Sequence, residues 1–567
     1  MSTDVSDAEK SPPGLAQGAP PQPSSHANTA TRESLEDYTL RFAPRSYRKW
    51  TAGVVATGAL GGIAYLADFS IGATIGISYG TTNALLGILV AAVIIFITGI
   101  PLAYYAARYN IDVDLITRGS GFGYYGSVIT NIIFATYTFI FFALEGSIMA
   151  QGLEQGLGIP KPIGYAVSAL VVIPLVIYGM KTLSKLQLWT TPLWLVLMVI
   201  PIGYLMLTNP DSIDNFFEYQ GENGTGSPNF AAIMLAAGVC LSLIVQIAEQ
   251  IDYLRFMPPK TDGNRVAWWR AMFLAGPGWV IFGALKQAIG LFIAVYIIAK
   301  LNPDAVSTAA EPVNQFLGVY SEMMPGWLAM TLAVILVVIS QIKINVTNAY
   351  SGSLAWTNSY TRITRHYPGR LVFIIVNVGI ALLLMEMNMF DFLNAILGFY
   401  ANIGIAWIVT VATDISINKY VLKLSPKFPE FRRGMLYAVN PVGFVSLILS
   451  AGISIAIFFG AFGPAVQPFS PIFAVVIAAI CTPVMAILTR GKYYLCRTHD
   501  GIELPMFDAE GNPSDVLLRC HVSGMEFERP DMMASPIPAA DGSKQYISSL
   551  MLATDKTGKL VLPPHLD

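Results

Sequence analysis

The chain has 567 residues and a net charge of −2, but only 12% of its residues are charged and 54% are hydrophobic. A soluble protein normally carries about 25% charged residues. With a mean hydropathy of +0.56, the composition therefore excludes an ordinary soluble domain. Apolar stretches of the roughly 20 residues that cross a bilayer as a helix recur between residues 50 and 489. The sequence thus predicts an all-α polytopic membrane protein.

Three regions follow one another along the chain. Residues 1–36 are rich in Ser, Pro, Ala, Gly and Gln and lack the apolar core of a signal peptide, which predicts a disordered leader. Residues 37–490 form the membrane domain, and residues 491–567 predict a small soluble C-terminal region. Cys496, His499, Cys520 and His521 in this region do not have the spacing of common zinc ligands. No metal site is expected there, with a decayed zinc ribbon as the alternative.

Twelve membrane-spanning helices are predicted. They cover residues 51–78, 84–107, 124–152, 162–180, 187–207, 230–254, 272–299, 325–352, 371–388, 391–413, 440–460 and 468–489. If the amino terminus is cytoplasmic, the loops on that side carry sixteen Lys and Arg residues and the outer loops carry two. This asymmetry follows the positive-inside rule. It predicts a multi-pass protein of the plasma (cytoplasmic) membrane with both termini in the cytoplasm.

Ionisable and amide side chains lie deep within several spans, where an unpaired charge is costly and usually faces a cavity or a partner. They are Asp68 in the first span, Glu145 in the third, Gln246, Glu249, Gln250 and Asp252 in the sixth, Lys286 in the seventh and Lys343 in the eighth. Spans one and six, and spans three and eight, correspond if five helices repeat as five inverted helices followed by two extra ones. The glycine-rich first span can unwind readily, so broken helices 1 and 6 are expected.

The eighth span places different chemistry on two of its faces. Gln341, Asn345 and Asn348 step by four and three residues, so they share one face of a helix. Lys343 lies roughly 140° away from Asn348. This helix should therefore be buried on two sides, with amides that can bind a heterocycle on one side and an ammonium group that needs an anion on the other.

At these residues the chain resembles the nucleobase–cation symporter family, which includes the purine–cytosine, allantoin and hydantoin permeases. Asn345, Asn348, Tyr350 and Ser351 resemble the family's eighth-helix motif, and residues 252–256 resemble the close of its sixth helix. Phe141 and Glu145 fall where members place a ring-stacking aromatic residue and a polar ligand to the base. The resemblance covers about residues 36–490. It implies two inverted five-helix repeats and alternating access to a site near the midplane for a planar nitrogenous substrate.

The resemblance and the deep polar residues together predict a substrate site formed by Phe141, Glu145, Gln246, Glu249, Asn345 and Asn348. Lys343 departs from the family, because it stands near hydroxyl residues that bind sodium in sodium-coupled members. We expect its ammonium group to occupy the sodium site and to pair with Asp68. Transport would then be independent of sodium, with a proton as the coupling cation. A static structural ion pair is the alternative.

The predicted function is a secondary active transporter, or permease, that imports a nucleobase or related heterocycle such as cytosine, a purine or an allantoin-like ring. Two alternatives stay open: an amino-acid or amine transporter on the same scaffold, and a membrane ligand sensor. The sequence has no recognisable catalytic set, nucleotide-binding motif or cofactor site, so neither an enzyme nor a pump is expected. The expected partners are the substrate, a coupling cation and the lipid bilayer, and not a nucleic acid.

Overall fold

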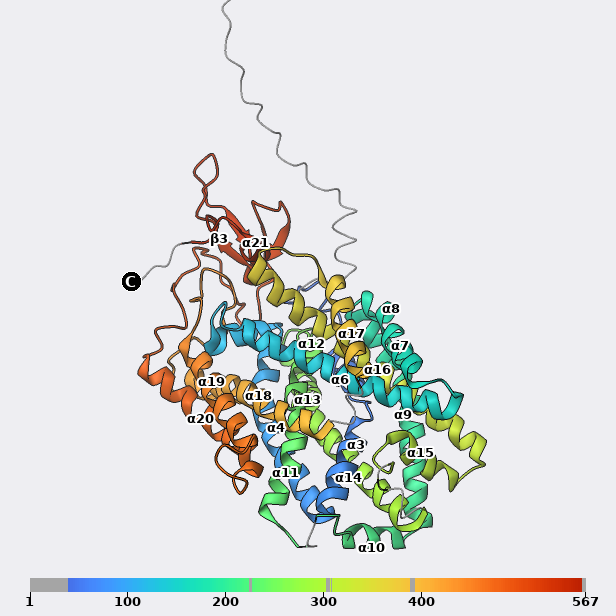
Figure 1. Ribbon diagram of the computed structural model, residues 1–567. Coiled ribbons are helices and arrows are strands. Elements are labelled where there is room, and N and C mark those ends of the chain that lie inside the picture. Colours follow the sequence, from blue (N-terminus) through green and yellow to red (C-terminus); the bar gives the residue numbers. More distant parts are fainter. Residues whose placement is uncertain (1–38, 224–226, 302–305, 307, 388–392, 563–567) are drawn as a thin grey trace, which may run out of the picture.

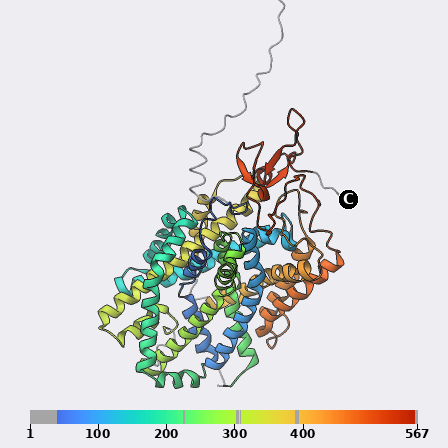
Figure 2. The same cartoon turned by 180° about the vertical axis from the view of Figure 1, so that it is seen from behind.

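The computed structural model describes residues 39–223, 227–301, 306, 308–387 and 393–562, so the predicted leader lies outside the described residues. These residues form a bundle of long helices with a small module of strands at one end (Figures 1 and 2). The first half of the bundle contains α2 (Ala52–Gly62), α3 (Ala67–Tyr79), α4 (Thr81–Tyr109), α6 (Val128–Leu157), α7 (Lys161–Leu170), α8 (Val172–Ile177), α9 (Met180–Thr208), α11 (Phe230–Leu241) and α12 (Gln246–Leu254). The second half contains α13 (Arg265–Ala275), α14 (Trp279–Tyr296), α16 (Gly326–Thr364), α17 (Arg370–Glu386), α18 (Leu393–Thr413), α19 (Pro441–Phe458) and α20 (Ser470–Leu488). The short helices α5 (Val113–Thr117), α10 (Asp211–Glu218) and α15 (Pro312–Ser321) lie in connections.

Each predicted span corresponds to one helix or to consecutive helices, and we number the spans in chain order. Helix 1 is α2–α3, helix 2 is α4, helix 3 is α6, helix 6 is α11–α12, helix 7 is α13–α14 and helix 8 is α16. Within the described ranges, nine helices are long and apolar enough to cross a membrane, and the bent pair α2–α3 makes a tenth. The other two predicted spans are the shorter segment Lys161–Ile177, which contains α7 and α8, and the 17-residue α17. The chain is therefore a polytopic all-α membrane protein, as its sequence predicts.

The first and sixth spans are both irregular near their middle. Helix 1 is broken between α2 and α3, which meet at 50°. Residues 63–66 between them are not helical, so carbonyl groups at the break lose the N–H donors that a continuous helix would supply. In helix 6 the 3-10 turn Ser242–Val245 joins α11 to α12. The sixth helix thus changes its helical pitch, while the first bends sharply.

Two groups of helices pack around the site. In group one, which contains α2–α4 and α11–α14, α14 lies along α3, α11 along α4, and α13 along α2, and α12 packs against α2 and α4. In group two, which contains α6–α9, α16 and α17, the 39-residue α16 lies along α6. Helices α3 and α14 approach each other very closely: a Cβ at Gly72 would overlap the backbone of Gln287, and one at Gly290 would overlap the backbone of Phe69. This contact brings α14 against the break in helix 1.

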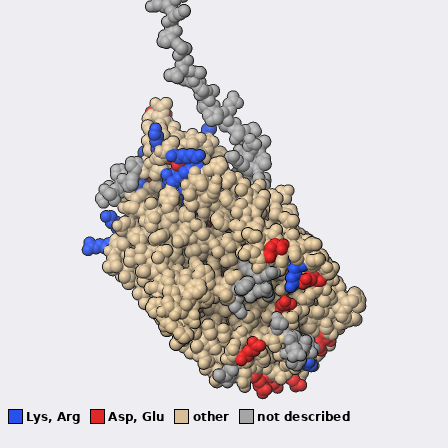
Figure 3. All heavy atoms as spheres, in the orientation of Figure 1, with Lys and Arg blue, Asp and Glu red and all other residues tan. Residues whose placement is uncertain are grey.

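Charged side chains on the surface gather at the two ends of the bundle. Lys and Arg are most evident over the strand module and the neighbouring end of the bundle, whereas Asp and Glu gather at the opposite end (Figure 3). The acidic end includes α10, which carries Asp211 and Asp214 in its first turn. On the face seen in Figure 3, a broad surface without charged side chains lies between the ends, as expected of a belt that contacts lipid. We call the basic end the module end.

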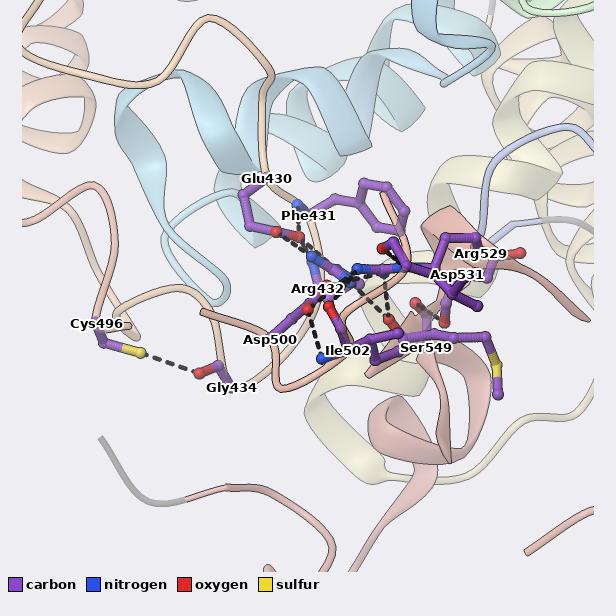
Figure 4. Close-up of polar contacts among 12 residues, drawn as sticks. Glu430, Phe431, Arg432, Gly434, Cys496, Asp500, Ile502, Arg529, Asp531 and Ser549 are labelled. Carbon is purple, nitrogen blue, oxygen red and sulfur yellow. Dashed lines mark hydrogen bonds and ion pairs between the residues drawn. The ribbon is translucent and has the colours of Figure 1, made fainter. Parts of the chain in front are cut away.

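The C-terminal module comprises residues 491–562. Strand β1 (Leu517–Arg519) pairs with β2 (Glu526–Glu528), β3 (Met532–Ala534) pairs with β4 (Tyr546–Ser548), and α21 (Ser549–Thr554) follows. Its small apolar core also includes Met435 from the connection between α18 and α19. Arg432 of that connection bonds to Glu430 and to Asp500, and Asp500 also pairs with Arg529 (Figure 4). The module is thus built onto the bundle through both apolar and charged contacts.

Candidate functional site

The break in helix 1 holds a buried ammonium group. Lys286 of α14 donates from Nζ to the carbonyl oxygens of Ile63 at 2.5 Å and Tyr65 at 2.9 Å. The same Nζ lies 2.9 Å from Oδ2 of Asp68, whose Oδ1 accepts a hydrogen bond from Gln287. Lys286 is 3% exposed and Asp68 is fully buried. The three oxygen atoms match the three donors of the ammonium group, which lies where unwound carbonyls could otherwise coordinate a small cation.

Lys343 does not pair with Asp68, so this prediction from the sequence is wrong. Lys343 instead contacts α9, where its Nζ donates to the hydroxyl groups of Thr190 and Thr191, both at 2.9 Å, and to the carbonyl oxygen of Gln187 at 3.2 Å. The physical reason is the direction of its face, because this side of α16 is turned toward α9 and not toward the break in helix 1.

The predicted separation of faces on α16 is confirmed. While Lys343 faces α9, Asn345 faces α6 and donates from Nδ2 to the carbonyl oxygen of Phe142 at 3.3 Å. Asn348 donates to Oδ1 of Asn345 at 3.2 Å. Within the described part of the chain, Oδ1 of Asn348 and both amide atoms of Gln341 have no hydrogen-bond partner, although both residues are buried. The amide face therefore retains free donors and acceptors inside the bundle.

A hydrogen-bonded chain links helix 3 to helix 6. The Tyr137 hydroxyl donates to Oε1 of Gln246 at 2.6 Å, and Nε2 of Gln246 donates to Oε2 of Glu249 at 2.7 Å. The ring centroids of Tyr137 and Phe141 are 4.4 Å apart. These hydrogen bonds fix the position of the aromatic side chains of α6 relative to Glu249. Oε1 of Glu249 has no partner among the described residues.

Glu145 is the least satisfied carboxylate of the site. It is 1% exposed, and neither of its oxygen atoms has a hydrogen-bond partner in the part of the chain that the structure describes. The Gln341 amide and the backbone N–H of Ala67 lie near it, without hydrogen bonds of ordinary geometry. A buried polar group without a partner is rare in native proteins, because it loses its hydration without compensation. Glu145 is therefore a group that a bound ligand or a proton would satisfy.

These groups form one cluster around the break in helix 1. Tyr65, in the break, lies within electrostatic range of Asp68, Tyr137, Glu145 and Glu249. Glu145 also lies within range of Lys286. The cluster draws on helices 1, 3, 6 and 7, and Gln341 adds helix 8. Four of the charged side chains that the sequence places at mid-bilayer depth, Asp68, Glu145, Glu249 and Lys286, are thus brought together, whereas Lys343 lies apart against α9.

Between the cluster and the module end, helix 6 is hydrogen-bonded to helix 8. Ser351 of α16 donates to Oδ2 of Asp252 at 2.5 Å, and Arg255 donates to the hydroxyl group of Tyr350 at 2.7 Å. Arg255 also lies 3.5 Å from Asp112, the N-cap residue of α5. The first two of these buried contacts join group one to group two on the side of the module end.

Three contributors to the cluster are not predicted from the sequence. The sequence places Lys286 at mid-bilayer depth, but its ion-pair partner depends on which helix packs against the break in helix 1. Tyr137 lies four residues before Phe141, and this spacing on one helix face was the available signal. Gln287 follows Lys286 directly and carries no sequence signal of its own.

Comparison with known proteins supports the architecture. No protein-family model and no curated protein sequence matches the chain. Among solved structures, the chain is similar to Mhp1, a nucleobase-cation-symport-1 family transporter. The closed conformation of Mhp1 with bromovinylhydantoin bound is 18% identical over 81% of this chain and 96% of that chain, with a TM-score of 0.55. Its inward-facing conformation is 18% identical over 80% of this chain and 97% of that chain, with a TM-score of 0.56. A Na⁺-coupled sialic acid symporter in a substrate-bound outward-open state is 14% identical over 81% and 93% of the two chains, with a TM-score of 0.53. At these identities the likeness shows a shared fold.

Proposed function

We propose that the chain is a secondary active transporter that imports a nucleobase or a related nitrogenous heterocycle by alternating access. One observation carries this proposal: buried polar atoms without partners, within the described residues, surround the break in helix 1. They are both carboxylate oxygens of Glu145, Oε1 of Glu249 and the amide atoms of Gln341; Oδ1 of Asn348 adds a further free acceptor on the amide face of α16. A planar ring with N–H groups on its edge would satisfy them, and the Tyr137–Phe141 pair offers its face an aromatic surface. The similarity in fold to Mhp1, solved with a hydantoin bound, agrees with this substrate class.

In this proposal the coupling cation is a proton and not sodium. The helix 1 carbonyls of Ile63 and Tyr65, together with Asp68, already hold the Lys286 ammonium group. A sodium ion would have to displace this tethered cation from the same oxygen atoms. Two buried carboxylates, Glu145 and Glu249, have oxygen atoms without partners among the described residues, so we expect Glu249 to take up the proton while Glu145 stays ionised to bind the substrate.

The transporter is proposed to lie in the plasma membrane with its module end in the cytoplasm. The basic side chains gathered at that end support this orientation, because Lys and Arg are enriched in short cytoplasmic loops. Both termini are then cytoplasmic, since the described chain starts at Thr39, next to α16, and continues to the module at the same end.

Ligand-induced thermal stabilisation of the purified protein tests the substrate class. Carboxylate acceptors outnumber free donors in the site, so an amino-substituted ring should bind more tightly than its oxo counterpart. We expect cytosine to raise the melting temperature more than uracil, and adenine more than hypoxanthine. Glu145→Gln should weaken cytosine binding about tenfold or more, the scale of a lost charge-assisted hydrogen bond.

The matched control is Glu154→Gln, since Glu154 lies on the same helix but its side chain is 43% exposed. This variant should keep the cytosine response of the parent protein. A screen in which no purine, pyrimidine, hydantoin or allantoin changes the melting temperature would contradict the proposed substrate class.

An amine or amino-acid transporter is the second candidate, and Glu145 is the observation that favours it. A substrate ammonium group could pair with the free carboxylate, while the Lys286 ammonium group is already bound to Asp68. The same thermal screen distinguishes the two candidates if it includes amino acids and polyamines. Stabilisation by an amine without stabilisation by any heterocycle would favour this second function.

A further inference from the structure

The C-terminal module contacts helix group one at three places. Before α2, Arg41 donates to Oδ2 of Asp531 at 2.9 Å, and the backbone N–H of Arg45 donates to Glu528 at 2.7 Å. Near the ends of α4 and α12, Asn512 accepts hydrogen bonds from the Arg108 side chain and from the backbone N–H of Lys260. The module therefore bonds to segments that lead directly into, or out of, helices 1, 2 and 6.

The same module also contacts helix group two. Arg365, which caps the end of α16, donates to the carbonyl oxygen of Ala553 at 3.3 Å, and α21 packs against α16. At the start of the described chain, Asn358 of α16 donates to the carbonyl oxygen of Thr39 at 2.7 Å. The module and the segment before α2 thus tie the end of helix 8 to the start of helix 1 (Figures 1 and 2).

Two ion pairs at this junction are buried, unlike the exposed pair of Arg45 and Asp515. The side chain of Arg41 is 17% exposed and that of Asp531 is fully buried. Arg48 and Glu528, whose charged groups lie 3.6 Å apart, are 1% and 7% exposed. Removing one partner from a buried ion pair leaves an uncompensated charge, so such contacts resist partial opening. They differ from the ion pair of Lys544 and Glu503, which is 62% and 91% exposed on the outer surface of the module.

We propose that the C-terminal module is a latch that holds the module ends of the two helix groups together and keeps the pathway closed on that side. Opening of the pathway at the module end must separate helices 1 and 6 from helix 8. The Asp252–Ser351 and Arg255–Tyr350 hydrogen bonds now join helix 6 to helix 8. Because the module is bonded to both groups, it has to release one of them before they separate. The inference rests on the proposed alternating access, but it does not depend on the identity of the substrate.

A cysteine at residue 355 reports on this opening. Ala355 is 4% exposed and lies one helical turn beyond Ser351 toward the module end, on the same side of α16. Ala355→Cys should therefore react slowly with a maleimide in the purified full-length protein at pH 7.5. Peptide mass spectrometry reads each site separately, so the native cysteines can remain.

Two variants that weaken the latch are compared in the protein that carries Ala355→Cys. Arg41→Gln removes one buried ion pair of the attachment to group one. Arg365→Asn removes a hydrogen bond of the attachment to group two while keeping a residue that tolerates the positive φ of 59° at this position. Either should increase the labelling rate of Ala355→Cys about tenfold, the scale of a lost charge-assisted hydrogen bond. Lys544→Gln is the matched control, and it should leave the rate unchanged.

Labelling rates that stay at the parent value in both latch variants would overturn the latch. An increase in the Lys544→Gln control equal to that in the latch variants would also overturn it, because the effect would not require the bridging contacts. Neither labelling result depends on ligand binding. The labelling experiment can therefore contradict the latch proposal without contradicting the proposed substrate class, which the thermal screen tests separately. Cys520, fully buried in the module core, gives the reference rate for unfolding of the module itself.

Discussion

At the scale of single residues, Lys286 is the side chain on which the coupling proposal depends. It neutralises Asp68 and satisfies two carbonyl groups at once. Removing one member of a buried ion pair costs about 3–5 kcal/mol, because the remaining charge has no compensation. The lysine is therefore both a structural element of the helix 1 break and the reason to expect transport without sodium.

Replacing this lysine should open a place for sodium. In Lys286→Ser the carbonyl oxygens of Ile63 and Tyr65 and the Asp68 carboxylate are left without a cation, which is the oxygen environment that sodium needs. We expect the variant to melt at a higher temperature in sodium chloride than in choline chloride, whereas the parent protein melts at the same temperature in both.

Lys343 provides the matched control for this experiment. It is equally deep in the bundle, but its ammonium group is held by Thr190 and Thr191 of α9, away from Asp68. Lys343→Ser should therefore melt at the same temperature in the two salts. Sodium stabilisation of Lys343→Ser and not of Lys286→Ser would contradict the assignment.

At the scale of helices, the close approach of α3 and α14 decides which lysine reaches Asp68. A Cβ at Gly72 would overlap backbone atoms of Gln287, and a backbone segment cannot move aside as a flexible side chain does. We expect Gly72→Ala to push the two helices apart and to destabilise the protein by about 1–3 kcal/mol, the usual range for overpacking. The melting temperature of the purified variant measures this effect.

Gly452→Ala is the control for the change from glycine to alanine. Gly452 lies within α19 and a Cβ there would meet nothing within 4 Å, so the variant should be as stable as the parent or slightly more stable. If both variants melt at the parent temperature, the close approach at Gly72 does not determine the position of α14.

The sequence predicts the helices well and their partners poorly, and Lys343 illustrates the difference. Apolar length identifies most spans, because each must cover the bilayer: nine helices and one bent pair among the described residues are long and apolar enough to do so. Helical spacing also correctly separates the faces of Asn345 and Lys343. Pairing between distant residues depends on which helices touch, and this depends on small residues such as Gly72 and Gly290. The helix that packs against each of these glycines is known only when both helices are placed in the structure. For this reason the sequence predicts that Asp68 is paired, but it does not show that the partner is Lys286 and not Lys343.

At the scale of the whole molecule, the junction between the module and the bundle should depend on pH. Burial raises the pKa of Asp531 to about 7, although Arg41 acts in the opposite direction; Glu528 adds to the rise. Burial also raises the pKa of Glu528. The ordinary pKa of an Asp in an unfolded chain is about 3.9, so the folded junction binds more protons than the unfolded one between about pH 4 and pH 7. The stability of the junction should accordingly fall as pH rises through this window.

Hydrogen exchange of the full-length protein in detergent measures this dependence. After correction for the intrinsic exchange rate, protection of the β3 and β4 amides should decrease from pH 5 to pH 7.5 in the parent protein. Asp531→Asn removes the titrating carboxyl group but keeps an acceptor for the backbone N–H of Phe42. Its protection should depend less on pH and should exceed that of the parent at pH 7.5. Protection in the parent that increases with pH would mean that the Arg41–Asp531 attraction outweighs the cost of burying the charge, and the latch would then close more firmly in alkaline than in acidic solution.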